Sequence, residues 1–488
     1  MNSNKLFRAY IISYLNYFLF PLISFISYLS TKIQIMQTID QYIETHQDRF
    51  LDELFGLIRI PSISSMPEHR PDIDKASAYW VKILIEAGAD NAGIFETSGN
   101  PVVFAEKTID PALPTVLVYA HMDVMPIDPL DQWKTDPFDP VVSEGRIWAR
   151  GANDDKGQSF MHAKAFEYLV RTNTLNCNVK FIIEAEEEVG SPNLAAFCLG
   201  HKELLKADII LVSDTGMIAR NIPSITVGLR GLAYWQIEVT GPNRDLHSGI
   251  FGGAVANPIN ELCKMIAGVT DQDNRITVPG FYDDVADVSG HEREKLAIAP
   301  FNEEAYRSSL AIGAVQGETG FSTMERTGIR PTFDVCGIWG GYSGQGAKTV
   351  LPSKAYAKIS SRLVPNQDHN KIAELFTKYF ESVATDAIKV EVTYLHGGQG
   401  YICPIDLPAY RAAESAYVDV FGRKPVPVRS GGSIPIISVF EEILGIKTIL
   451  MGFGLESDAI HSPNENFALE NFYNGIRTIV RFYHHYGK

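Results

Sequence analysis

Four short, predominantly apolar runs constrain the fold of this 488-residue chain more than any other feature of its sequence. Runs of this kind are typical of strands that are buried on both faces of a parallel sheet. They cover residues 116–120, 179–183, 209–212 and 446–451. Helical patterns accompany them over residues 158–171, from Ser191-Pro192 onward and over residues 469–486. This alternation predicts an α/β fold with a doubly wound, mainly parallel sheet.

A second pattern occupies residues 226–397. Residues 232–240 alternate between apolar and polar, which indicates a strand with one buried face. A helix from Pro258 follows, then strands near 333–337 and 355–364, a helix near 371–382 and a strand over 389–394. The order β-α-β-β-α-β predicts a smaller, ferredoxin-like α/β sandwich inserted into the larger domain. We therefore expect the larger domain in two parts, 36–225 and 398–488, and assign no structure to 270–330.

The first 35 residues are interpreted separately. Residues 9–31 carry no charge and follow Lys5 and Arg8, an order found in signal anchors, and they are long enough to span a bilayer. Polar residues and a proline interrupt the segment, and no cleavage motif follows it. Met36 could also be the functional start. An extension without a structural role, a membrane anchor and a signal all stay open.

Composition excludes several classes of protein. The net charge of −15 makes a nucleic-acid partner unfavourable. With 45% hydrophobic and 21% charged residues, the chain is neither disordered nor fibrous. Its five cysteines are widely spaced and form no CxxC pair, which argues against a disulfide scaffold or a thiolate zinc finger. We expect a reducing compartment, the cytoplasm, with a membrane partner only if residues 9–31 act as an anchor.

Histidine and carboxylate residues follow all four predicted strands. In open α/β sheets, ligands bind beyond the carboxyl ends of the strands. These ends present His121, Asp123, Glu184, Glu186, Glu187, Glu188, Asp214, Asp458 and His461, and Asp154 and Asp155 precede the helix over 158–171. Imidazole and carboxylate are the side chains that bind divalent metals. The sequence therefore predicts a metal site.

Each of these residues also has an ordinary structural interpretation. A buried histidine can hydrogen-bond to a nearby aspartate, an aspartate before a helix can cap it, and an acidic run is usually solvated. Carboxylates crowded at the end of a buried strand, however, raise one another's pKa values unless cations neutralise them. It is their convergence that favours a metal. No HExxH motif is present, and neither the 344–349 loop nor Ser433 fits a phosphate loop or a nucleophile elbow.

Ten motifs, in order from about residue 37 to the C-terminus, carry a specific resemblance. They are HMDV, RGANDDKG, EAEEEVGS, VSDT, GLRG, DLHSG, GAKTVLP, SRLVPN, GGSIP and DAIHSPNE. The sequence resembles the M20-like di-zinc exopeptidase family, which contains carnosinases, Cys-Gly dipeptidases, carboxypeptidase G, aminoacylase and succinyl-diaminopimelate desuccinylase. Three of the motifs are similar to the substrate-binding segments of its dipeptidase branch. The resemblance therefore implies a dipeptidase.

The resemblance also implies a metal centre with two divalent ions, zinc or manganese. His121 and Asp214 would hold one ion, Glu188 and His461 the other, and Asp154 would bridge them through a cis Asp154–Asp155 peptide. Asp123 would orient His121, and Glu187 would be the general base. An aspartate rather than a glutamate at position 214 favours a dipeptidase over a deacylase.

Substrate recognition and assembly follow from the same resemblance. Arg362 would bind the C-terminal carboxylate of the peptide, and Thr349 and Ser433 lie in the substrate-binding segments. His247 would come from the neighbouring subunit of a homodimer to stabilise the oxyanion, so that the inserted domain is a lid and a dimerisation domain. Two alternatives remain. One is an N-acyl-amino-acid deacylase or desuccinylase that uses the same site, and the other is a non-catalytic, metal-stabilised binding protein.

Overall fold

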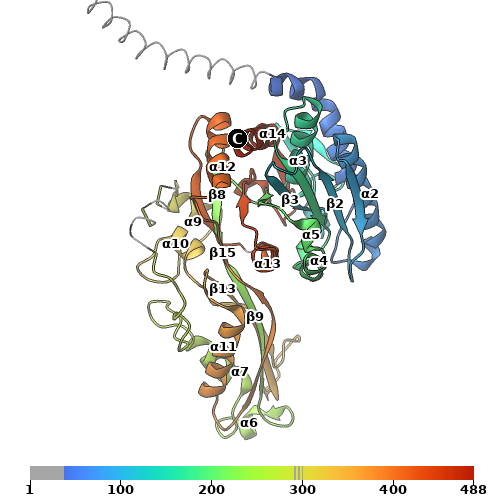
Figure 1. The fold of residues 1–488 in the computed structure, drawn as a ribbon. Coiled ribbons are helices and arrows are strands. Elements are labelled where there is room, and N and C mark those ends of the chain that lie inside the picture. Colours follow the sequence, from blue (N-terminus) through green and yellow to red (C-terminus); the bar gives the residue numbers. More distant parts are fainter. Residues whose placement is uncertain (1–37, 289, 291–292, 295–296, 299, 433) are drawn as a thin grey trace, which may run out of the picture.

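The two strand patterns of the sequence form two different sheets, which lie in separate lobes (Figure 1). The computed structural model describes residues 38–288, 290, 293–294, 297–298, 300–432 and 434–488. The segment over 9–31 and Ser433 lie outside the described residues. Helices and strands of both lobes confirm the predicted α/β fold class.

The larger sheet contains nine strands, and the four apolar runs form four neighbouring ones. Its order is β1 (Asn91–Phe95), β2 (Val102–Lys107), β6 (Asn178–Glu184), β3 (Thr115–His121), β7 (Ile209–Val212), β17 (Thr448–Leu450), β8 (Ser224–Leu229) and β15 (Tyr401–Ile402), with β16 (Val426–Ser430) paired to β8. β6, β3, β7 and β17 pair in parallel. Their carboxyl ends therefore meet at one edge of the sheet.

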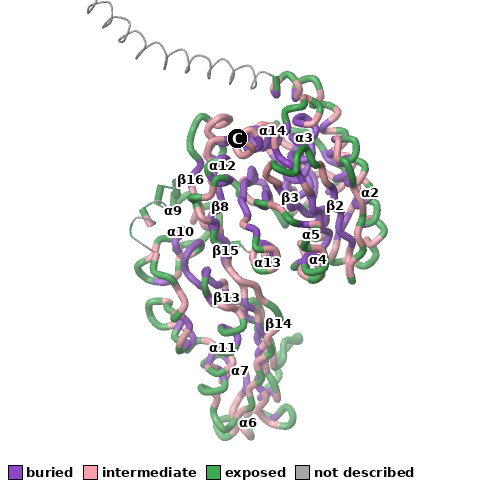
Figure 2. The backbone as a smooth tube through the Cα atoms, viewed as in Figure 1, coloured by how far each residue is buried: buried purple, intermediate pink, exposed green. Residues whose placement is uncertain are grey.

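Helices cover both faces of this sheet, as the prediction of a doubly wound domain requires. A helix over 38–58, α2 (Arg70–Ala87), α3 (Lys156–Arg171) and α14 (Leu469–Tyr486) lie on one face, and α12 (Pro408–Phe421) packs on α14. α4 (Leu194–Gly200), α5 (Lys202–Leu205) and α13 (Pro435–Leu444) lie on the other. Phe166 of α3 contacts Phe181 of β6, whereas Phe440 of α13 contacts Tyr119 of β3. The central strands β3, β6 and β7 between these layers are almost entirely buried (Figure 2).

The second lobe has the predicted split βαβ arrangement. Its elements follow the chain order β9 (Gly231–Thr240), α7 (Pro258–Ala267), β11 (Asp334–Gly340), β13 (Lys354–Leu363), α11 (His369–Val383) and β14 (Lys389–Gly398). The sheet order is β11-β13-β9-β14, and all neighbours are antiparallel. Trp235 of β9 packs on Phe376 of α11 within a separate hydrophobic core. The alternating residues of β9 thus bury one face under α7 and α11.

Two segments refine the predictions. The helix expected from Ser191-Pro192 begins only at Leu194, because Ser191 has a positive φ of 51° and its hydroxyl donates to Glu184 at 2.8 Å instead of capping a helix. The 270–330 segment contains α9 (Glu303–Ser309) and α10 (Thr323–Gly328). A buried ion pair between Arg330 and Glu318, at 2.7 Å, holds part of it in place. The predicted domain boundaries stay predictions.

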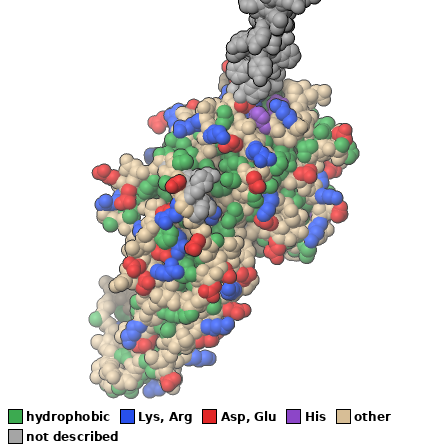
Figure 3. Space-filling model, turned by 60° about the vertical axis from the view of Figure 1, so that its left-hand side comes forward, with side chains coloured by type: hydrophobic (Ala, Val, Ile, Leu, Met, Phe, Trp, Pro, Cys, Tyr) green, Lys and Arg blue, Asp and Glu red, His purple; other side chains and the backbone are tan. Residues whose placement is uncertain are grey.

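Acidic and basic side chains are interspersed over one face of the molecule rather than separated by sign (Figure 3). Among the described residues, no helix has both the length and the apolar composition needed to cross a membrane. All five cysteines are free.

Candidate metal centre

The edge where the central parallel strands end carries the predicted ligands. His121 is the last residue of β3, and Asp214 follows β7 by two positions. Glu188 lies in the 3-10 helix η3 (Glu187–Val189) after β6, and Asp154 lies just before α3. His461 belongs to the loop that follows β17 and the 3-10 helix η4 (Glu456–Asp458). The topology of the sheet therefore brings together residues from five separate segments.

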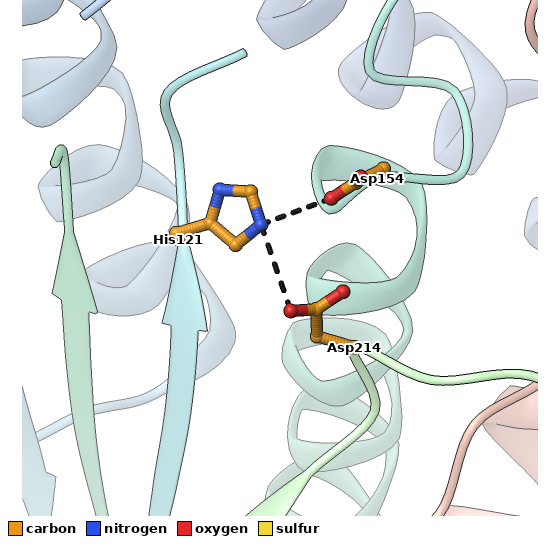
Figure 4. Close-up of side chains that lie close together, drawn as sticks. All are labelled: His121, Asp154 and Asp214. Atoms are coloured by element: carbon orange, nitrogen blue, oxygen red, sulfur yellow. Dashed lines mark hydrogen bonds and ion pairs between the residues drawn. The ribbon is translucent and has the colours of Figure 1, made fainter. Parts of the chain in front are cut away.

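His121, Asp154 and Asp214 form the first group of possible ligands (Figure 4). Nε2 of His121 lies 3.1 Å from Oδ1 of Asp154 and 3.9 Å from Oδ2 of Asp214. One possible ligand atom from each residue lies within 4.8 Å of the others. This spacing suits three ligands that converge on one cation.

Asp154, Glu188 and His461 form a second group of the same size. Nε2 of His461 lies 3.0 Å from Oδ2 of Asp154 and 3.1 Å from Oε2 of Glu188. Asp154 thus belongs to both groups, with Oδ1 toward the first and Oδ2 toward the second. The Asp154–Asp155 peptide is cis, as the family resemblance implied. The side chain of His461 is half exposed, so the second group is open to solvent.

Asp123 contacts residues of the proposed metal centre without being one of the proposed ligands. Nδ1 of His121, on the side of the ring away from Asp154, lies 3.1 Å from the backbone carbonyl of Asp123 and 3.4 Å from its Oδ1. The same carboxylate accepts the backbone N–H groups of Glu187 at 3.3 Å and Glu188 at 3.1 Å. A histidine ligand commonly has its second nitrogen held in this way. Asp123 therefore contacts both a possible ligand and the segment that carries Glu187.

Asp155 does not cap α3. It occupies the residue before the helix, but its side chain makes no capping hydrogen bond. Its Oδ2 instead accepts the backbone N–H of His121 at 3.3 Å. The capping interpretation considered for this motif is therefore not what the structure shows.

Burial and neighbouring charges shift the pKa values of several side chains at this site. Burial, reinforced by the nearby Asp154, raises the pKa of Asp214 to about 7. Burial also raises the pKa values of Glu187 and Glu188. Hydrogen bonds with Asp154 and Glu188 raise the pKa of His461 to about 10. Positive charge nearby, from a protonated histidine or a bound cation, would lower the pKa values of these carboxylates.

The donor set fits divalent metal ions. Both groups offer only imidazole nitrogen and carboxylate oxygen, with no thiolate. Imidazole suits zinc, and carboxylate oxygens also suit manganese. The shared carboxylate of Asp154 allows two neighbouring ions to be held together. The geometry thus fits the expected two-ion centre.

Three other predicted site residues lie in the second lobe. His247 ends β10 (Leu246–His247) and pairs with Val350 of β12 (Val350–Leu351), so it adjoins Thr349. The carbonyl of Thr349 accepts the N–H of Ser248 at 3.1 Å. Arg362 is half-buried on β13, and burial lowers its pKa. The structure therefore brings His247 and Thr349 together, away from the two ligand groups.

The sequence placed Asp458 among the strand-end candidates, but Asn153 and Arg146, which connect the ligand loops with it, were not expected at the site. Nδ2 of Asn153 donates to Oδ2 of the buried Asp458 at 2.8 Å, and Arg146 pairs with the same carboxylate. These contacts link the loop of Asp154 to the loop of His461. Both Asn153 and Asp458 stand inside quoted motifs, next to or near the predicted ligands. Their proximity in sequence to those ligands was the available signal.

Several known proteins are similar to this chain in sequence or in structure. The family model described as peptidase family M20/M25/M40 matches residues 117–485. The chain is 32% identical over 461 residues to the Cys-Gly metallodipeptidase dug1 of Schizosaccharomyces pombe, which covers 91% of this chain and 97% of that relative. The structure of human carnosine dipeptidase 1 matches with a TM-score of 0.80 and 31% identity, over 93% of this chain and 99% of that one. The M20 family metallo-carboxypeptidase Sso-CP2 from Sulfolobus solfataricus matches with a TM-score of 0.81 and 31% identity, over 90% and 99%.

Proposed function

The chain belongs to peptidase family M20/M25/M40, and we propose that it hydrolyses dipeptides at the centre around Asp154 with two divalent metal ions. Family membership makes it a hydrolase of the metallopeptidase class. One observation carries the proposal of two ions: the two oxygens of Asp154 face two different groups of possible ligands.

Five side chains would hold the ions. His121 and Asp214 would bind one, Glu188 and His461 the other, and Asp154 both. Zinc is the first candidate and manganese the second, because the donors are nitrogen and oxygen. When bound, such ions lower the pKa of a coordinated water from about 15.7 toward 7 and polarise a peptide carbonyl.

Glu187 would act as the general base and later as the acid. It precedes Glu188 directly, but it belongs to neither ligand group. Its carboxylate would take a proton from the attacking water and deliver it to the leaving amine. Asp123, which accepts hydrogen bonds from the N–H groups of Glu187 and Glu188, would hold this segment in a fixed position relative to His121. Adjacent glutamates would thus serve different roles.

His247 would stabilise the oxyanion from the partner subunit of a homodimer. It is exposed and directly precedes α6 (Ser248–Phe251), which lies at the end of the second lobe remote from the large sheet (Figure 1). An oxyanion donor must come within about 3 Å of the developing charge. The edge strand β11 also exposes Val335, Ile338 and Trp339, a surface suited to a second copy. Both observations support a site completed in trans.

Arg362 would bind the C-terminal carboxylate of the substrate. Its planar guanidinium suits two parallel hydrogen bonds to a carboxylate. Arg230 is close enough that the positive charge of Arg362 lowers its pKa, second to burial. Two guanidinium groups with Asp334 as a nearby carboxylate give a position that suits an anionic group. Thr349 and Ser433 would contribute further contacts to the substrate.

Two other substrate classes compete with dipeptides. A deacylase would use the same centre on N-acyl amino acids, but the aspartate at position 214 argues against it. A carboxypeptidase would remove the last residue of longer peptides, as the name of the Sulfolobus solfataricus relative suggests.

A non-catalytic, metal-stabilised protein is less favoured because it would not require Glu187. A cytoplasmic location, part of the same proposal, is supported by five free cysteines.

A substrate panel tests the proposal. The metal-free protein is reconstituted with zinc or manganese and offered dipeptides, tripeptides, longer peptides and N-acyl amino acids. We expect the largest specificity constant for a dipeptide with a free amine and a free carboxylate. Preference for acyl amino acids would establish the deacylase, and preference for longer peptides the carboxypeptidase. A fully loaded protein that cleaves none of them would contradict enzymatic function.

A further inference from the structure

Glu465 is fully buried beside the metal centre, and its carboxylate accepts four hydrogen bonds. Oε1 accepts the backbone N–H groups of Asn153 and Asp154, each at 3.1 Å. Oε2 accepts Nη1 of Arg150 at 2.7 Å and the N–H of Gly151 at 3.1 Å. Three of the four donors thus belong to the backbone of the loop that ends in the shared ligand Asp154.

A small sheet places Glu465 at this loop. Glu465 directly precedes β18 (Asn466–Ala468), which pairs antiparallel with β5 (Arg146–Trp148). The pairing continues one step further, where the N–H of Ala149 donates to the carbonyl of Glu465 at 3.1 Å. Glu465 also follows His461 by four positions. One carboxylate therefore connects the loop of His461 to the loop of Asp154.

Glu465 forms an ion pair with the buried Arg150. Arg150 is 1% exposed, donates to Glu465 and to the carbonyl of Pro126, and lies over the ring of Trp133. Removing one partner of such a pair leaves an uncompensated buried charge. The arrangement is more specific than charge neutralisation requires, however, because three of the four hydrogen bonds come from backbone N–H groups, those of Gly151, Asn153 and Asp154, rather than from other cations.

We propose that Glu465 is a positioning residue for the metal centre: it holds the backbone of residues 151–154 so that each oxygen of Asp154 faces its own group of ligands. A rotation of the Asp154 backbone would break the bond from its N–H to Oε1. Arg150 balances the charge without contacting Asp154. This inference rests on the proposed function, because the group that Glu465 positions is the carboxylate proposed to bridge the two ions.

A matched control separates positioning from plain stability. Glu167 on α3 is another buried carboxylate, 2% exposed, paired with Arg49 and Lys164. It contacts none of the proposed ligands. Glu167→Gln and Glu465→Gln remove the same charge from buried, ion-paired carboxylates, and both should lower thermal stability. Only Glu465→Gln should weaken metal binding.

The test measures zinc affinity rather than activity. Metal-free wild type and both variants are titrated with zinc against a chromophoric chelator, and the visible spectra of the cobalt-loaded proteins are compared. Loss of a group that orients a ligand typically weakens metal binding ten- to hundredfold. We expect a fall of this size for both ions in Glu465→Gln, because Asp154 is shared, with an altered cobalt spectrum. Glu167→Gln should bind zinc as wild type does.

Outcomes distinguish the inference from the proposed function. If wild type binds two zinc ions and Glu465→Gln binds them within about twofold of wild type, Glu465 does not position the centre, whereas the proposed function stands. If wild type binds neither zinc nor manganese, both are wrong. Should Glu465→Gln fail to fold, the double variant Arg150→Gln, Glu465→Gln removes the charge imbalance but still places an amide donor among the N–H groups. Wild-type affinity in that variant would equally overturn the inference.

Discussion

Asp154 differs from the other carboxylates of the centre because a histidine nitrogen lies against each of its oxygens. Burial alone would raise its pKa, but hydrogen bonds with His121 and His461 outweigh that effect and hold the pKa below its ordinary value. Asp214 has no comparable compensation, and its pKa is raised. Two aspartates at one edge of a sheet therefore differ because of the atoms that face them.

At the residue scale, the first prediction concerns Glu187. Replacing Glu187 with Gln removes the proposed base but no proposed ligand. We expect turnover to fall by about a hundred- to ten-thousandfold, the usual contribution of general acid–base catalysis, while two metal ions stay bound. Steady-state kinetics and elemental analysis of the same preparation measure both quantities. Loss of an ion from this variant would show that the roles of Glu187 and Glu188 are exchanged.

The second prediction concerns substrate selectivity at Arg362. Arg362→Ala should reduce the specificity constant for free dipeptides by about ten- to a hundredfold, since a charge-assisted contact contributes roughly 1.5–3 kcal/mol. Peptides with an amidated C-terminus lack the carboxylate and should lose much less. Parallel kinetics on a dipeptide and its amide make the comparison. An equal loss on both substrates would show that Arg362 does not recognise the carboxylate.

At the scale of elements, helix α3 begins next to the proposed metal centre, and farther along it forms ion pairs with another helix. Asp154 and Asp155 directly precede it, whereas Lys164 and Glu167, farther along, form an ion network with the helix over 38–58. Arg49 and Tyr42 of that helix both donate to Glu167. The network ties the first described helix to the helix that begins at the ligands.

The third prediction is a pH dependence of this helix pair. Burial would raise the pKa of Glu167, but hydrogen bonds from Arg49 and Lys164 lower it from 4.5 to about 2. A pKa that is lower in the folded state stabilises the protein above pH 4.5, and this stabilisation is lost as the pH falls toward 2. It amounts to at most about 3 kcal/mol.

Urea unfolding of wild type and Glu167→Gln checks this dependence. The difference in free energy of unfolding between the two proteins should be largest above pH 5 and should shrink as the pH falls toward 2. Other carboxylates titrate in both proteins, so only the difference is informative. A difference independent of pH would mean that the ion network does not stabilise the ionised form of Glu167.

At the scale of the whole molecule, the two lobes divide the proposed work. The larger lobe carries the five proposed ligands, whereas His247, Thr349 and Arg362 lie on strands or loops of the second lobe. β9 begins two positions after β8 ends, so the lobes are connected there by a short crossing at Arg230. The guanidinium of Arg230 donates to the carbonyl of Gly431 and to the carbonyl of Arg330, at the end of the 270–330 segment. These hydrogen bonds hold the connection between the two lobes in place.

The fourth prediction tests completion of the site by a second copy. His247→Ala and Glu187→Gln chains should each be inactive as homodimers. A heterodimer of the two has one site in which both residues are intact, if His247 acts in trans. With random assembly, about a quarter of all sites should recover, measured as dipeptide hydrolysis after the chains are mixed and refolded. No recovery in heterodimers of verified composition would refute the role of His247 in trans, but not the metal centre.

Local patterns were sufficient for most of the fold and for the proposed ligands. Apolar runs predicted β3, β6, β7 and β17, because a strand that is buried on both faces carries predominantly apolar side chains along its whole length. Residues at the ends of those strands became ligand candidates without knowledge of their distances, since parallel strands end at a common edge. Ser191 is the exception. Its predicted cap fails because the hydroxyl donates to Glu184 rather than to its own helix.

Tertiary structure alone decided how the loops meet. Arg150 and Glu465 lie 315 positions apart, and Asn153 and Asp458 lie 305 apart, yet both pairs form beside Asp154. No periodicity or motif encodes such pairs, because they depend on β18 pairing with β5. The sequence by itself determined which residues could bind metal, through the chemistry of the side chains at the strand ends. The packing of distant loops decided that Asp154 presents one oxygen to each group, because only buried partners from elsewhere in the chain hold its backbone in place.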